Sequence, residues 1–200
     1  MPVQPASHLT KLRIILITLA LFVFVACTPA PTDTADNLIV DRWRLPAPPT
    51  LTPDQISLPT VWLGSDGSEA VLGTMSAFSY QDKSSGLNVH GDPAIPSASN
   101  VANTNLAPDR SGVIIIAAEY GTIQSIEVWI RPWKEAVENF ALFEGERIQG
   151  ESSQAGDIFT HTLTPLGTTE DSLLVVHIQF DNPRENGDAL YIWRLNASLP

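Results

Sequence analysis

Short segments in which apolar and polar side chains alternate run through most of this chain, and they constrain its fold more than any other feature. In the clearest of them, Ile126, Val128 and Ile130 alternate with Glu127 and Arg131. A period of two places one face of a β-strand in a core and the other face in water. The sequence shows no sustained helical repeat. It therefore predicts an all-β domain.

The predicted strands follow one another at regular spacing, with turn residues between them. Pro132 ends the 125–131 strand, and the residues after it, 133–138, are predicted to form one helical turn. Short strands separated by turn chemistry favour an antiparallel β-sandwich. The segments are 60–63, 70–80, 87–89, 113–118, 125–131, 140–149 as a hairpin that turns at Glu144-Gly145, 158–163, 172–180, and 189–195 after a turn at Asn186-Gly187-Asp188.

The N-terminal stretch predicts export and a lipid anchor. Lys11 and Arg13 precede an apolar run, residues 14–26, that is too short to cross a bilayer comfortably as a helix. The run ends in Phe24-Val-Ala-Cys27, which resembles the lipobox of bacterial lipoproteins, although that family usually has Leu where this chain has Phe24. The resemblance implies that Cys27 is lipidated and becomes the new N-terminus. The alternatives are an uncleaved membrane anchor and a buried cysteine.

Charge and cysteine content narrow the classes of partner. Because Lys11 and Arg13 lie in the leader, 9 Lys and Arg residues oppose 22 Asp and Glu residues after Cys27, a net charge near −13. Such a chain repels phosphate backbones, so nucleic acid is not a predicted partner. With Cys27 used by the anchor, no thiol remains for a disulfide, a thiolate metal site or a nucleophile.

Composition also divides the chain. We expect a signal peptide at 1–26, a lipid-anchored, Pro-rich linker at 27–59 and the β-sandwich at 60–200. Within the linker, residues 38–45 are more apolar than a spacer needs. They are expected either to dock on the domain or to place Trp43 at the membrane interface. Residues 86–110 form a long connection rich in Gly, Pro, Ser and Asn.

Residues 59–195 resemble a group of exported bacterial lipoproteins that carry one immunoglobulin-like sandwich. The resemblance rests on the segments 71–80 (VLGTMSAFSY), 88–93 (NVHGDP), 125–129 (SIEVW) and 187–191 (GDALY). It implies an immunoglobulin-like β-sandwich of about eight or nine short strands. It implies no activity, because the group has no established one.

The residues that carry chemistry in enzymes are scattered. Ser76 lacks the second glycine of a nucleophile elbow. The histidines of the domain, His90, His161 and His177, lack the paired spacing of zinc enzymes, and we expect the two in mid-strand, His161 and His177, to be exposed. No cofactor is predicted.

A loop rich in carboxylates offers a candidate calcium site. Asp181, Glu185 and Asp188 are gathered within residues 181–188, and oxygen ligands suit a hard cation. The spacing does not match an EF-hand, and the same residue types are those that a tight turn requires.

Two tryptophans form the candidate binding surface. Trp129 lies on the strand face opposite Val128, and Trp133 follows just past the strand. Flat aromatic side chains stack on sugars or anchor protein partners when exposed. The alternative is that these rings pack in a core.

The predicted function is that of a lipid-anchored, non-enzymatic binding module in a bacterial envelope, with a protein or glycan partner. The lipid would hold it on the outer face of the cytoplasmic membrane or on the outer membrane. One alternative is a structural accessory subunit of an envelope complex. A weaker alternative is a carbohydrate-binding or hydrolytic domain, with a cleft carboxylate of raised pKa among Glu119, Glu127 and Asp157.

Overall fold

The computed structural model describes residues 45, 58–65, 69–93, 96–104, 106, 111–117, 121–139, 141, 143–155, 158–165 and 170–197. The chain divides into two units, Met1–Thr34 and Ala35–Pro200, and every described residue belongs to the second. The leader and Cys27 lie outside the described residues, so the export and lipidation predictions stay predictions.

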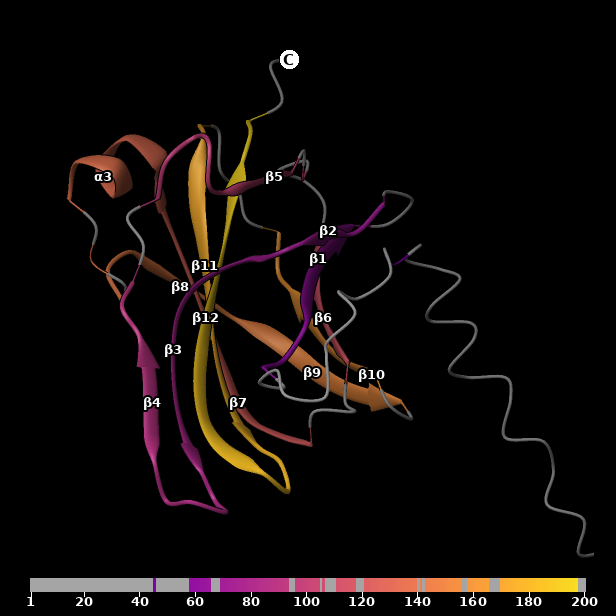
Figure 1. The fold of residues 1–200 in the computed structure, drawn as a ribbon. Helices are drawn as coiled ribbons and strands as arrows, with labels where there is room; N and C mark the ends of the chain where they lie inside the picture. The colour runs from indigo at the N-terminus through magenta and orange to yellow at the C-terminus, as the bar shows by residue number, and fades with distance from the viewer. Residues whose placement is uncertain are drawn as a thin grey trace, which may run out of the picture. The chain divides into compact units, whose positions relative to one another are not determined.

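The described strands form two sheets (Figure 1). The smaller sheet contains β1 (Val61–Ser65), β2 (Val71–Leu72), β6 (Gly112–Ala117), β9 (Gly150–Ala155) and β10 (Ile158–Leu163), in the order β2-β1-β6-β10-β9. The larger sheet contains β3 (Thr74–Asp82), β4 (Asn88–Gly91), β5 (Ala102–Thr104), β7 (Thr122–Pro132), β8 (Glu146–Ile148), β11 (Ser172–Asp181) and β12 (Glu185–Leu195).

The order in the larger sheet is β4-β3-β12-β11-β7-β8, with β5 parallel to the last residues of β12. The other strand pairs of both sheets are antiparallel. The prediction of an all-β, mainly antiparallel, two-sheet fold is therefore confirmed.

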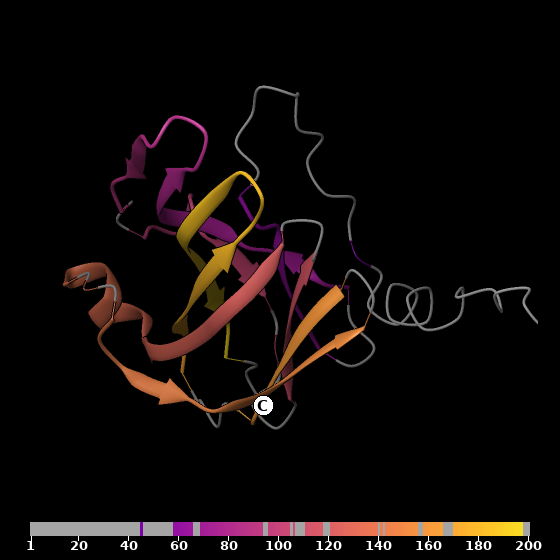
Figure 2. The same cartoon turned by 90° about the horizontal axis from the view of Figure 1, so that it is seen from below.

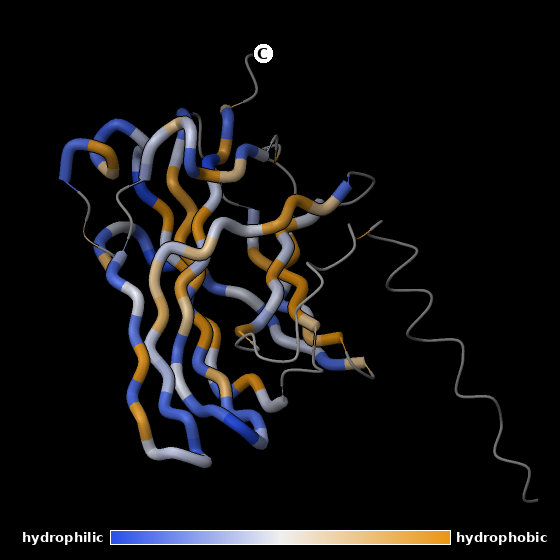
Figure 3. Tube along the Cα trace, viewed as in Figure 1, coloured by the Kyte–Doolittle hydropathy of each residue, from blue (hydrophilic) through white to orange (hydrophobic). Residues whose placement is uncertain are grey.

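The main core lies between the inner faces of the two sheets. Val128 and Ile130 are 1% and 7% exposed, and they stand opposite Val176 and Leu174 of β11. Ile126 packs against the same cluster. In Figure 3 the hydrophobic positions follow the strands, whereas the hairpin ends of the larger sheet are hydrophilic. The predicted inward face of the 125–131 strand is confirmed.

The outer face of the larger sheet carries a second, smaller core. Leu173, Val175 and Ile192 are buried there, although they alternate with residues that face the main core. A short helix, α3 (Trp133–Glu138), packs beside this face (Figures 1 and 2) and buries Ala136 against it. Because β11 is buried on both faces, its sequence reads as a nearly continuous apolar run.

The outer face of the smaller sheet is apolar too. Trp62 is 2% exposed, and Ala70 and Ile115 are buried beside it. Leu45, the described residue of the 38–45 segment, packs against this cluster. At least this residue of the predicted linker therefore contacts the domain.

A strand that changes sheets closes one side of the sandwich. The chain runs from β2 in the smaller sheet straight into β3 in the larger one, and Gly73 is the only residue between them. The Gly73 N–H donates to the Val61 carbonyl at 2.8 Å. The indole of Trp193 lies beneath the crossing, and its Nε1 donates to the Val71 carbonyl at 3.0 Å. The chain passes between the sheets a second time after β8. That strand pairs in the larger sheet, and one residue later the chain continues as β9 in the smaller sheet.

Two local predictions are wrong. The turn predicted at Asn186-Gly187-Asp188 lies inside β12, because Asn182 forms the turn instead: its side-chain oxygen accepts the N–H groups of Arg184 and Glu185 at 2.8 and 2.6 Å. Residues 140–149 do not form their own hairpin, since β8 pairs with β7. Within the 86–110 connection, β4 overlaps the predicted 87–89 strand, and β5 is a further short strand that was not predicted.

Candidate functional site

An exposed phenylalanine stands on the outer face of the larger sheet, at the point where β7 and β11 lie side by side. The Phe143 side chain is 53% exposed. Its ring meets Trp129 of β7 edge-on, with centroids 5.3 Å apart and planes at 70°. It meets His177 of β11 in the same way, at 5.4 Å and 71°. Edge-to-face contacts of this kind stabilise an aromatic pair beyond simple burial.

The loop that carries Phe143 is held against the sheet by Arg131. Arg131 of β7 is buried, and its guanidinium donates to the Ala141 carbonyl at 3.4 Å and lies 3.6 Å from the Glu144 carboxylate. Gly145 adopts φ 130°, and a Cβ there would lie 2.5 Å from the Ile130 carbonyl oxygen. The loop thus approaches β7 so closely that only glycine fits, and the Phe143 ring has a defined place.

Charged groups lie beside Trp129 and His177, the two rings that Phe143 contacts. Arg147 of β8 donates to the Glu127 carboxylate at 2.7 Å. His177, whose side chain is 12% exposed, lies between two carboxylates: its Nδ1 is 3.7 Å from Glu127 and its Nε2 is 3.4 Å from Asp188. Together these residues form the Phe143 patch, defined as Glu127, Trp129, Phe143, Arg147, His177 and Asp188.

The two tryptophans singled out from the sequence are mainly packing residues. Trp129 lies on the predicted face but is only 9% exposed, because it belongs to the second core. Trp133 is half-buried beneath Arg194, whose guanidinium carbon stands 4.8 Å from the ring centroid. Arg194 also donates to the Asp171 carboxylate at 2.6 Å, which lowers the pKa of Asp171. The exposed aromatic surface is provided by Phe143 instead.

The candidate calcium ligands have other partners. Asp181 pairs with Lys83, and Glu185 accepts a hydrogen bond from the Asn182 amide at 2.9 Å. Asp188 belongs to the Phe143 patch. Among the described residues, no group of three or more His, Cys, Asp or Glu side chains is arranged to hold a metal ion.

The remaining histidines and Ser76 do not converge on one site. His161 is buried, so the expectation that it is exposed is wrong. Its Nδ1 lies 2.9 Å from the Ser152 hydroxyl across the β9–β10 pair, and burial lowers its pKa. His177 is also largely covered, by Phe143 and Trp129. Ser76 is a buried residue of β3.

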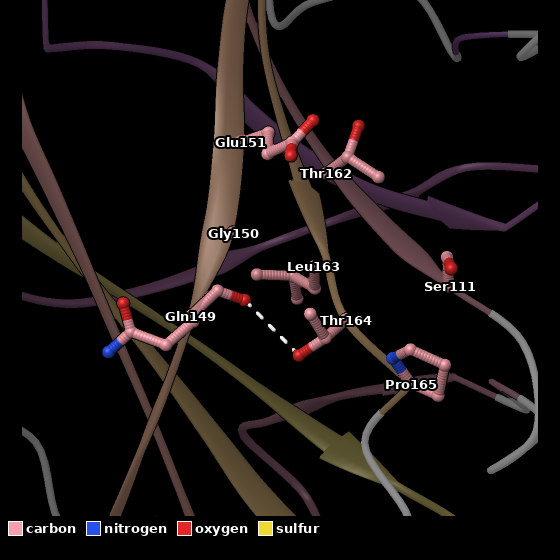
Figure 4. Close-up of a pocket in the computed structure, with 8 residues that line it drawn as sticks. All are labelled: Ser111, Gln149, Gly150, Glu151, Thr162, Leu163, Thr164 and Pro165. Atoms are coloured by element: carbon pink, nitrogen blue, oxygen red, sulfur yellow. Dashed lines mark hydrogen bonds between the residues drawn. The ribbon is translucent and has the colours of Figure 1, made fainter.

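A hollow of about 440 Å³ lies at the edge of the smaller sheet (Figure 4). Gln149, Glu151, Thr162 and Thr164 line it with polar groups, and the Thr164 hydroxyl donates to the Gln149 carbonyl at 3.3 Å. Leu163 supplies apolar lining. None of the residues singled out from the sequence lines this hollow.

Of the carboxylates proposed for hydrolysis, Glu127 forms an ion pair with Arg147, and Glu119 and Asp157 lie outside the described residues.

Sequence reasoning missed Phe143, whose neighbours Glu144 and Gly145 indicated only a turn. Within the described part of the chain, no helix has the length and apolar character needed to cross a membrane.

Comparison with known proteins assigns the chain to no family. Neither a protein-family model, nor a curated protein, nor a solved structure matches the chain. The resemblances to bacterial lipoproteins and to their immunoglobulin-like group therefore stay predictions.

Proposed function

We propose that this protein is a lipid-anchored, non-enzymatic binding module of a bacterial envelope, and that it contacts its partner through the Phe143 patch. Cys27 carries the lipid, and the sandwich lies outside the cytoplasm. We also propose that the sandwich is immunoglobulin-like. The two-sheet, mainly antiparallel architecture supports this, although it is a coarser feature than the family itself.

The observation that carries the proposal is the rigid exposure of Phe143. More than half of its side chain faces solvent, yet the ring is held against Trp129 and His177 and its loop is tied to Arg131. A large side chain that is already ordered loses little conformational entropy on binding. Aromatic residues of this kind are enriched at the centres of protein interfaces.

Cross-linking in membranes tests the proposal. A photoreactive residue replaces Gln179, which is exposed in β11 and pairs in register with Asp188 of the patch. A control replaces Glu151, which is exposed in β9 of the other sheet. We expect a specific adduct from position 179 that disappears in Phe143→Ser and persists in Leu87→Ser, where another exposed apolar residue is removed.

The accessory-subunit alternative predicts a different result. A subunit without a binding site of its own would give adducts that do not depend on Phe143. Equal adducts from positions 179 and 151, or adducts that survive Phe143→Ser, would therefore contradict the proposed function.

A further inference from the structure

The strand β9 is the longest of the four strands that end the two described sheets. It closes the smaller sheet, with β10 on one side and no described strand on the other. The other end strands are shorter, since β2 has two residues, β8 three and β4 four, whereas β9 has six. All residues of β9 except the last are exposed. Such an edge offers a row of backbone donors and acceptors to another chain.

The devices that usually protect a sheet edge are missing from β9. Proteins block such edges with proline, with lysine or with a bulge that twists the strand away. The strand reads Gly-Glu-Ser-Ser-Gln-Ala, and it pairs with β10 without a register shift. Its side chains are small or polar, and Glu151 carries its one charge. The edge is therefore regular and open to pairing.

The hydrogen bonds to β10 determine which backbone groups of β9 point to the open side. The Gln149 carbonyl accepts the Thr164 N–H at 3.3 Å, so these two residues form a hydrogen-bonded pair. Such pairs alternate along an antiparallel ladder, so Glu151, which stands opposite Thr162, also bonds to β10 (Figure 4). The N–H and C=O groups of Ser152, the next residue, therefore point away from β10.

This alternation makes β9 complementary to itself. When the open edges of two identical strands meet antiparallel, a two-fold axis perpendicular to the sheet relates them, and the same face of each sheet lies on the same side. With the axis at Ser152, each Ser152 N–H donates to the carbonyl of the partner's Ser152, and Glu151 stands opposite the partner's Ser153. A register shift of one pair in one direction brings the two Glu151 carboxylates face to face, which is destabilising. A shift in the other direction carries Gly150 past the end of the partner strand.

We propose that two copies of this chain dimerise through β9 and join their smaller sheets into one continuous antiparallel sheet. The occupant of the edge is a second copy because an identical strand satisfies the outward-pointing backbone groups in register. It also places small polar side chains beside small polar side chains on both faces. The chain after Cys27 is acidic, but repulsion between exposed charges is largely screened beyond about 8 Å at physiological salt.

Single cysteines test the register. Cys27 is the one cysteine of the chain, so each variant adds one defined thiol, and wild type measures any contribution of Cys27. In cells that express the full chain, a membrane-permeant oxidant should link Ser152→Cys into a disulfide dimer, because opposite Cα atoms in a hydrogen-bonded pair lie about 5.5 Å apart. Gln154→Cys is the matched control. Its thiol lies about 13 Å along the ladder from its copy, and it should give no more dimer than wild type.

A backbone variant tests the ladder itself. Ser152→Pro removes an N–H that points to the open side and leaves the pairing with β10, whereas Ser152→Ala removes only the hydroxyl that contacts His161. In sedimentation of the full chain in detergent, Ser152→Pro should weaken dimerisation by about tenfold or more, because two symmetry-related hydrogen bonds are lost. Ser152→Ala should change it by less than about twofold. Thermal melts confirm that each variant is folded.

Three results overturn the inference. They are the absence of a Ser152→Cys dimer, equal dimer yields from positions 152 and 154, and dimerisation of Ser152→Pro that equals that of Ser152→Ala.

The dimer does not depend on the Phe143 patch, so the two proposals fail separately. Phe143→Ser should leave the Ser152→Cys dimer unchanged, and a dimer that disappears in Phe143→Ser would overturn the β9 contact. A photoadduct at position 151 that joins two copies has the mass of two chains. It is therefore distinguished from the adduct with another protein that the comparison of positions 179 and 151 measures.

Discussion

The crossing at Gly73 gives the sharpest test of how this sandwich is held together. A Cβ at Gly73 would lie 2.4 Å from Cζ2 and 2.8 Å from Cη2 of Trp193. Real Cβ contacts are longer than 3.0 Å. Trp193 is 0% exposed, and its Nε1 is bonded to the Val71 carbonyl. The ring therefore cannot move away without losing its hydrogen bond or compressing the core.

The expected cost of Gly73→Ala follows from this crowding. The φ of Gly73 lies outside the left-handed region, so alanine meets a lack of space rather than backbone strain. Overpacking a filled core lowers the free energy of unfolding by about 1–3 kcal/mol. For a domain of this size that loss lowers Tm by roughly 3–10 °C.

A double-mutant cycle assigns the cost to the contact. Trp193→Phe removes the outer ring of the indole, which holds both atoms nearest to the Gly73 position. In the Trp193→Phe background, Gly73→Ala should therefore cost less than about 0.5 kcal/mol, well below its cost in the wild type. Urea unfolding of the four proteins, followed by tryptophan fluorescence and circular dichroism, measures each free energy.

Gly86→Ala serves as the control for the cycle. Gly86 adopts φ 71°, and no atom lies within 4 Å of the point that a Cβ would occupy, so alanine is strained there for a local reason. Its cost should be the same in both backgrounds. If Gly73→Ala is also additive with Trp193→Phe, or if it leaves stability unchanged, the reasoning from the crossing is refuted.

Three further outcomes are expected. Val128→Asp places an unpaired carboxylate in the main core and should abolish cooperative thermal unfolding, whereas Trp129→Ser should lower stability by about 3–5 kcal/mol because the ring is buried in the second core. A cooperative melt of Val128→Asp at the wild-type Tm would contradict this. Cys27→Ala should abolish incorporation of labelled fatty acid, and labelling that persists would exclude the proposed anchor. A hydrogen bond from the Ser84 hydroxyl lowers the pKa of Asp82 to about 2. A lowered folded-state pKa stabilises the fold above the unfolded value of about 4. The stability difference between wild type and Asp82→Ala should therefore shrink as the pH falls from about 5 towards about 2 in urea titrations, and a constant difference would contradict it.

The alternation of apolar and polar residues predicted which strand residues face the main core, because that choice depends on side-chain type. Val128 and Ile130 face inward as their period requires, and so does Trp193. The same pattern could not reveal β9, whose residues are almost all exposed and polar. That strand exists because its backbone pairs with β10 along its whole length, and backbone pairing leaves no signature in side-chain type.

Turn chemistry was misleading for a related reason. Gly187 was predicted to lie in a turn. It lies in a strand instead, and glycine is required there because β3 approaches closely: a Cβ would lie 2.1 Å from the Ser79 carbonyl oxygen. The Phe143 patch was not predictable from sequence, because residues from separate segments of the chain meet there. Its loop depends on Arg131, which the strand pattern indicates only as a solvent-facing charge.

The way the chain enters the sandwich has a mechanical consequence. A domain held to a membrane by its N-terminal segment, as proposed, and to a partner by its larger sheet carries any load through β1. That strand pairs with β6 along its whole length, and the Tyr191 hydroxyl of the larger sheet donates to the Pro59 carbonyl just ahead of it. A pull along β1 is perpendicular to its ladder hydrogen bonds, so they resist in shear and share the force.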